Sequence, residues 1–144
     1  MKLEDIYALW SKDSDIDKTE IGSELLKLAK LHHKYFQILS AERIRLLQLT
    51  AEQKQLKLDK YEFYTQGHTP ETKEKGWNLP SRGALLKAEA QPYIDCDKDV
   101  VDSTLKVGIQ NEKVELLRSI IDEIKSRNWY LRGCIEWEKF RNGG

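Results

Sequence analysis

The chain has 144 residues, and its 24 basic and 24 acidic side chains give a formal net charge of zero. This balance excludes a general attraction to nucleic acid or membrane, and the length favours a single helical domain over residues 1–144. With 40% hydrophobic and 33% charged residues, the composition favours helices with large solvated faces over a thick-walled enzyme.

The N-terminal part, residues 1–66, predicts a short helix followed by a long one. Residues 1–12 are amphipathic, and an acidic, polar break follows them. Asp17 and Glu20 have the spacing of a capping box, which predicts the start of a long helix there. No proline interrupts the chain from this point to Gln66, and Gly67 is a natural stop for the helix.

Residues 67–96 have the pattern of an irregular connector. Gly76, Pro80, Gly83 and Pro92 interrupt this stretch, and its apolar residues have no lasting period. The sequence Thr-Pro-Glu at 69–71 predicts one extra helical turn with proline in the first position. Residues 97–141 then form a second proline-free stretch, which predicts a long helix capped by Asp97 or Asp99.

The apolar pattern of the predicted C-terminal helix indicates self-assembly. Its apolar residues recur at steps of three, four or seven, and a second apolar row flanks the first. A hairpin of the two long helices could cover one such row, but the face is wider than one partner helix can bury. We therefore expect a helical oligomer in which this helix provides the contacts. The candidate oligomerisation residues are Val114, Leu117, Ile121, Ile124, Leu131 and Ile135.

Motifs for catalysis, metals and cofactors are not found in this sequence. It has no glycine-rich phosphate loop and no nucleophile elbow, and adjacent His32 and His33 cannot form a metal pair on a helix. Cys96 and Cys134 have no metal spacing and make no disulfide framework. No apolar run is long enough to cross a membrane, and the acidic N-terminus does not resemble a signal peptide. The sequence predicts a cytoplasmic protein that is not an enzyme, without cofactor, metal or catalytic residues.

Single-stranded nucleic acid is the partner indicated by the charge distribution. Residues 27–60 carry eight basic and three acidic side chains, whereas residues 1–24 carry seven acidic and three basic ones. Lysines at three-residue spacing run directly into aromatic residues, a combination that follows phosphates and stacks on bases. A solvated helix flank, with aromatics packed on the connector, is the alternative. The candidate DNA-binding residues are Lys54, Lys57, Lys60, Tyr61, Phe63 and Tyr64.

Short motifs in a fixed order resemble the UvsY family, the recombination mediators of tailed phages. They are MKLED at residues 1–5, EFY at 62–64 before Gly67, DKDV at 97–100 and IKSR at 124–127. The resemblance implies a phage-encoded protein of the host-cell cytoplasm that binds single-stranded DNA as a ring-like homo-oligomer, a hexamer or heptamer. It also implies two protein partners, a RecA-like phage recombinase, which the mediator helps to load, and the phage single-strand-binding protein, whose hold on the DNA it weakens.

One position of the family's DNA-contacting motif differs in this chain. Lys60 occupies the place of one basic residue of that motif, but the other basic place falls on Leu58, with Lys57 beside it. A structural or scaffolding helical oligomer without a nucleic-acid role is the alternative to the mediator. The clustering of lysines and aromatics at residues 54–64 favours the mediator, because a scaffold does not need it.

Overall fold

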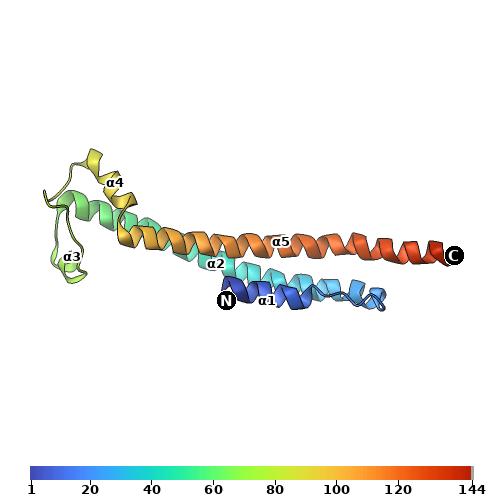
Figure 1. Cartoon of the computed structure of the whole chain (residues 1–144). Helices are drawn as coiled ribbons and strands as arrows, with labels where there is room; N and C mark the ends of the chain where they lie inside the picture. The colour runs from blue at the N-terminus through green and yellow to red at the C-terminus, as the bar shows by residue number, and fades with distance from the viewer. Residues whose placement is uncertain (144) are drawn as a thin grey trace. The chain divides into compact units, whose positions relative to one another are not determined.

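The computed structural model describes residues 1–143, and its regular structure is entirely helical (Figure 1). The predicted all-α class is confirmed, as is the order of a short helix, a long helix, an irregular connector and a second long helix. The elements are α1 (Leu3–Asp13), α2 (Ile21–Gln66), α3 (Pro70–Glu74), the 3-10 helix η1 (Lys87–Glu89), α4 (Ala90–Asp95) and α5 (Lys98–Arg141).

The ends of the long helices follow from local sequence. Gly67, with a φ of +91°, ends α2, and its N–H donates a 2.9 Å hydrogen bond to the carbonyl of Phe63. Pro70 begins α3, as predicted. Asp97 caps α5, because its Oδ1 accepts hydrogen bonds from the backbone N–H groups of Asp99 and Val100.

The predicted capping box at Asp17 is wrong. Helix α2 begins at Ile21, four residues after Asp17, so Glu20 is not inside its first turn. The Asp17 carboxylate instead accepts hydrogen bonds from the backbone N–H and the hydroxyl of Thr19, at 2.9 and 2.6 Å. Aspartate often closes such a local turn, which competes with helix initiation.

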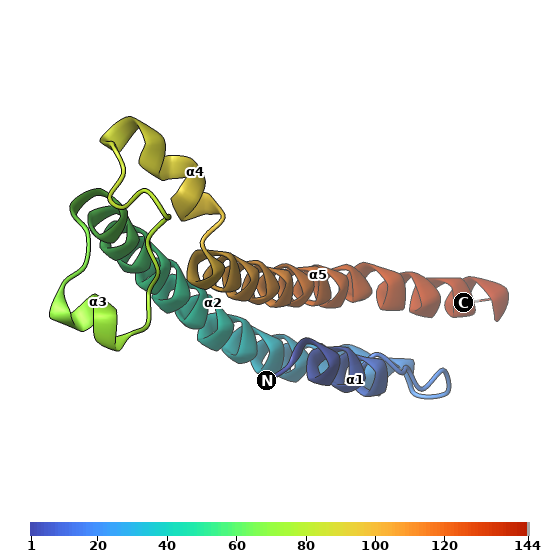
Figure 2. The same cartoon turned by 60° about the vertical axis from the view of Figure 1, so that its left-hand side comes forward.

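The chain divides into two compact units, and both long helices contribute to each. Unit 1 contains residues 1–45 and the part of α5 from Ile109 onward. In it α1 folds back along α2 (Figures 1 and 2), where Ile6 and Tyr35 are fully buried. The ring of Trp10 meets Tyr35 edge to face at 5.4 Å, and Asp13 accepts hydrogen bonds from Lys34 and Tyr35. Helix α1 is therefore part of the unit 1 core.

In unit 1, α5 runs antiparallel to α2 and also reaches α1. The Gln110 side chain donates a 2.9 Å hydrogen bond to the backbone carbonyl of Glu42. Arg127 is buried, donates a 2.7 Å hydrogen bond to the carbonyl of Ser14, and lies over the ring of Trp10. Most of the apolar seam of α5 packs inside this unit.

Unit 2, residues 46–108, folds the connector onto the end of α2. Helices α3 and α4 flank that end in both views (Figures 1 and 2). The backbone N–H of Leu85 donates a 2.7 Å hydrogen bond to the carbonyl of Tyr64, which ties the connector to α2. The buried core consists of Phe63, Tyr64, Leu85, Ala90, Ile94 and Val100, with Leu56, Tyr61, Trp77 and Leu79 packed around it.

Candidate nucleic-acid interface

The predicted lysines lie on two sides of α2. Lys54 and Lys57 are exposed and form no ion pair among residues 1–143, whereas only 2% of Lys60 is exposed. Three residues turn a helix by about 300°, so each lysine lies about 60° further around the axis than the last. The third lysine therefore reaches the face on which Leu56 and Phe63 pack into the core.

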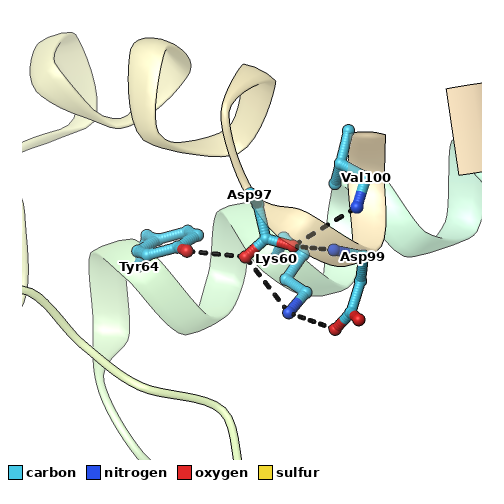
Figure 3. Close-up of polar contacts among 5 residues, drawn as sticks. All are labelled: Lys60, Tyr64, Asp97, Asp99 and Val100. Carbon is cyan, nitrogen blue, oxygen red and sulfur yellow. Dashed lines mark hydrogen bonds and ion pairs between the residues drawn. The ribbon is translucent and has the colours of Figure 1, made fainter. Parts of the chain in front are cut away.

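Lys60 is clamped between the two aspartates at the start of α5 (Figure 3). Its ammonium lies 2.9 Å from Oδ2 of Asp99 and 3.2 Å from Oδ2 of Asp97. The same ammonium lies 3.7 Å from the centre of the Trp77 ring. Two carboxylates and an aromatic face thus compensate a charge that burial alone would make unfavourable.

Asp97 connects this clamp to the helix cap. Its Oδ2 accepts a 2.6 Å hydrogen bond from the Tyr64 hydroxyl and also faces Lys60 (Figure 3). Burial alone would raise the pKa of Asp97, but the hydrogen bonds from Tyr64 and Lys60 and the lysine charge outweigh it and hold that pKa below 3.8. Burial, and then the hydrogen bond to Asp97, raise the pKa of the Tyr64 hydroxyl.

The predicted DNA-binding aromatic residues are packed in unit 2 rather than exposed to solvent. Phe63 and Tyr64 are buried in the core of unit 2, and Tyr61 is half-buried beside them. The Phe63 ring meets the rings of Tyr64, His68 and Trp77 edge to face, at 5.2, 5.0 and 5.4 Å. Of the six candidate DNA-binding side chains, only those of Lys54 and Lys57 are exposed.

A pocket of about 610 Å³ lies next to the Lys60 clamp. It lies between the last turns of α2, the connector around Trp77, helix α4 and the start of α5. Sequence reasoning missed this site, although lysine and tryptophan in the connector at Lys75 and Trp77 repeat the basic–aromatic pattern of α2. The lining residues are Lys60, Tyr64, Lys75, Gly76, Trp77, Asn78, Pro92, Tyr93, Cys96, Asp97, Lys98 and Asp99.

The candidate oligomerisation residues pack within the chain itself. Val114, Leu117, Ile121, Ile124 and Leu131 are buried in unit 1, and Ile135 is half-buried. Further along α5, large aromatic side chains are exposed, with 76% of Trp129 and 77% of Phe140 open to solvent. Trp129, Tyr130, Trp137 and Phe140 project from the side of the helix opposite Ile124 and Leu131, given 3.6 residues per turn.

The described residues contain no grouping of three His, Cys, Asp or Glu side chains that could hold a metal ion. Within residues 1–143, no helix has the length and hydropathy that crossing a membrane requires.

The fold defines the class of protein: an all-α chain with two long antiparallel helices, α2 and α5, and a basic and aromatic segment at the end of α2. A sequence model of the UvsY family, described as a recombination, repair and single-stranded DNA binding protein, matches residues 9–144. The chain therefore belongs to the UvsY family, which confirms the resemblance of the short motifs. No curated protein sequence matches the chain.

Solved structures agree with the family assignment at the level of the fold. A crystal structure of the bacteriophage T4 recombination mediator protein UvsY, lattice type II, is 23% identical with a TM-score of 0.81, over 99% of both chains. Lattice type I of the same protein is 20% identical with a TM-score of 0.81, over 95% of this chain and 98% of the other.

Proposed function

We propose that this protein is a recombination mediator. It binds single-stranded DNA and promotes the loading of a RecA-like phage recombinase onto strands that a phage single-strand-binding protein covers. The family match over residues 9–144 carries this proposal, because that family is described by recombination, repair and single-stranded DNA binding. The T4 protein with the same fold is itself described as a recombination mediator.

Lys54 and Lys57 are the side chains of α2 that we assign to the DNA phosphates. Both side chains are exposed on α2, and no carboxylate among residues 1–143 pairs with them. Lys60, Phe63 and Tyr64 would need to leave the core of unit 2 to touch DNA directly. Their burial supports a different role, in which they hold the end of α2 against the start of α5.

We further propose that the protein acts as a ring-like homo-oligomer, a hexamer or heptamer. The exposed aromatic side of α5 supports this, because monomeric proteins rarely leave so much apolar surface in one patch. A neutral subunit with one modest basic patch gains avidity when that patch is repeated around a ring.

Recombinase loading provides the direct test. Single-stranded DNA is first saturated with the phage single-strand-binding protein, and the DNA-dependent ATPase of the RecA-like recombinase is then followed with and without this protein. We expect the lag before ATP hydrolysis to shorten. An unchanged lag at saturating protein contradicts the mediator function. If the protein also fails to bind bare single strands, a scaffolding oligomer is the better description.

A further inference from the structure

We propose that the pocket beside the Lys60 clamp binds one unstacked nucleotide of single-stranded DNA. This inference rests on the single-stranded DNA binding proposed above and adds a second contact, on the connector side of unit 2. We call this cavity the nucleotide pocket; its lining includes Lys60, Lys75, Trp77, Tyr93, Lys98 and Asn78. Its volume of about 610 Å³ is within the usual range of small-ligand sites, about 300–1,000 Å³.

The charged groups of the nucleotide pocket leave two cations available for an anion. Its lining has three lysines against two aspartates. Lys60 already engages both aspartates, and Asp97 is further held by Tyr64 and by the backbone of α5. Lys75 and Lys98 are exposed and form no ion pair among the described residues. A phosphate at the mouth of the pocket therefore meets two ammonium groups without having to displace a carboxylate.

Aromatic walls supply the surface for a base. Tyr93 is 40% exposed, and its ring lies 6.1 Å from that of Tyr64. Trp77 also lines the pocket, but the Lys60 ammonium lies 3.7 Å and the Lys75 ammonium 5.0 Å from its ring centre, so Tyr93 is the ring that we assign to stacking on a base. Stacking on such rings tolerates any base, and the Asn78 side chain adds a hydrogen-bond donor and an acceptor at the wall.

A pocket of this kind discriminates between single and double strands. A base can enter only when it is neither paired nor stacked on both neighbours, and a duplex must first disrupt that stacking at a cost of a few kcal/mol. Lys54 and Lys57, on an open helix surface, cannot make this distinction, because they contact only phosphates. The nucleotide pocket is thus the part of unit 2 that selects single strands.

The lysine arm of the test uses the full-length protein and a labelled oligothymidylate, with binding measured by anisotropy at several salt concentrations. The double variant Lys75→Gln/Lys98→Gln is compared with Lys87→Gln/Lys106→Gln, which removes equal charge from exposed positions outside the pocket. We expect the salt slope to fall by about 0.7 in the pocket variant, because its two lysines meet one phosphate and each single-strand phosphate contact contributes roughly 0.7. Equal slopes in both double variants would overturn the pocket.

The aromatic arm replaces Tyr93 by Ser and compares it with Tyr7→Ser, an exposed tyrosine of α1. We expect at least about a fivefold loss of affinity for the single strand, an unchanged salt slope, and a smaller preference over duplex of the same length. Thermal melting monitors the fold of each variant. If the wild type binds the oligonucleotide and either pocket variant matches its control, the pocket assignment fails and the proposed function stands. If the wild type does not bind at all, the proposed function fails with it.

Discussion

The Tyr64 hydroxyl donates a 2.6 Å hydrogen bond to Oδ2 of Asp97, which joins the last turns of α2 to the residue that caps α5. The other carboxylate oxygen of Asp97 accepts hydrogen bonds from the backbone N–H groups of Asp99 and Val100 in the first turn of α5. One side chain therefore fixes both the start of α5 and its position on α2 within unit 2. The buried Lys60 ammonium depends on the same carboxylate for charge compensation.

The first prediction concerns acid stability. The pKa of Asp97 is held below its ordinary value of 3.8, because the hydrogen bonds from Tyr64 and Lys60 outweigh the effect of burial. Below pH 3.8 the unfolded chain gains a proton that the folded chain still lacks, so the stabilisation is complete above that pH and is lost as the pH falls through the folded pKa. Replacing Asp97 by Asn should remove about 1–3 kcal/mol at neutral pH.

Urea unfolding at several pH values measures this effect. The difference in unfolding free energy between wild type and Asp97→Asn should shrink as the solution is acidified below pH 3.8. Asp95→Asn is the matched control, since Asp95 is exposed and its carboxylate accepts a 2.8 Å hydrogen bond from the Gln91 side chain one helical turn before it. A difference that stays constant with pH would show that Asp97 acts through its cap and not through its charge.

The helix plan could be predicted from sequence, because each boundary depends on residues that are neighbours in the chain. Gly67 and Asp97 act through backbone groups within a few positions, and the absence of proline extends over whole segments. The burial of Lys60 also had a local signal, since it lies four residues after Leu56 and three before Phe63, on the apolar face. Counting lysines at equal spacing obscured the rotation of about 60° per step.

The partners of Lys60 could not be predicted from its sequence neighbours. Asp99 lies 39 residues further along the chain, and Trp77 belongs to a stretch without hydrophobic period. Such contacts arise only when the connector folds onto α2, which depends on packing among Phe63, Leu85 and Ile94. The nucleotide pocket is a product of that packing, so no single motif encodes it.

The second prediction is that the exposed lysines of α2 contribute to DNA binding but not to the stability of the fold. The double variant Lys54→Gln/Lys57→Gln should lower the slope of the logarithm of single-strand affinity against that of salt concentration by about 1. Its stability should change by no more than about 0.5 kcal/mol, because both side chains are exposed. Lys2→Gln/Lys18→Gln removes the same charge from exposed positions in the acidic N-terminal segment and should keep the wild-type slope. Anisotropy titrations at the same salt concentrations measure the slopes of the two double variants and of the wild type.

The third prediction gives Lys60 a structural role. Replacing it by Met leaves Asp97 and Asp99 without their shared cation and should cost about 2–4 kcal/mol of unfolding free energy. Asp99 is 48% exposed and can regain water, which keeps the loss below that of a fully buried pair. Under conditions where the variant is folded, its salt slope for single-stranded DNA should equal that of wild type. A stable variant with a reduced slope would instead make Lys60 a direct DNA contact.

The fourth prediction concerns the exposed aromatic side of α5. Trp137 and Phe140 stack at 5.9 Å between ring centres and are both open to solvent in the single chain. If this side packs between subunits, Trp137→Ser/Phe140→Ser should reduce the native molar mass to that of smaller species, because about 1.5–3 kcal/mol of burial per large apolar side chain is lost. Helix content should stay near wild type, since neither side chain belongs to the core of unit 1.

Light scattering and circular dichroism on one sample test both parts of this expectation. Lys139 lies between the two aromatic positions in sequence and is also exposed, so Lys139→Ser should leave the molar mass unchanged. If the double aromatic variant keeps the wild-type mass, subunit contacts involve other exposed apolar side chains, such as Leu26 and Leu47. The smaller species should also bind single-stranded DNA with lower affinity, because each retains fewer copies of the Lys54 and Lys57 surface.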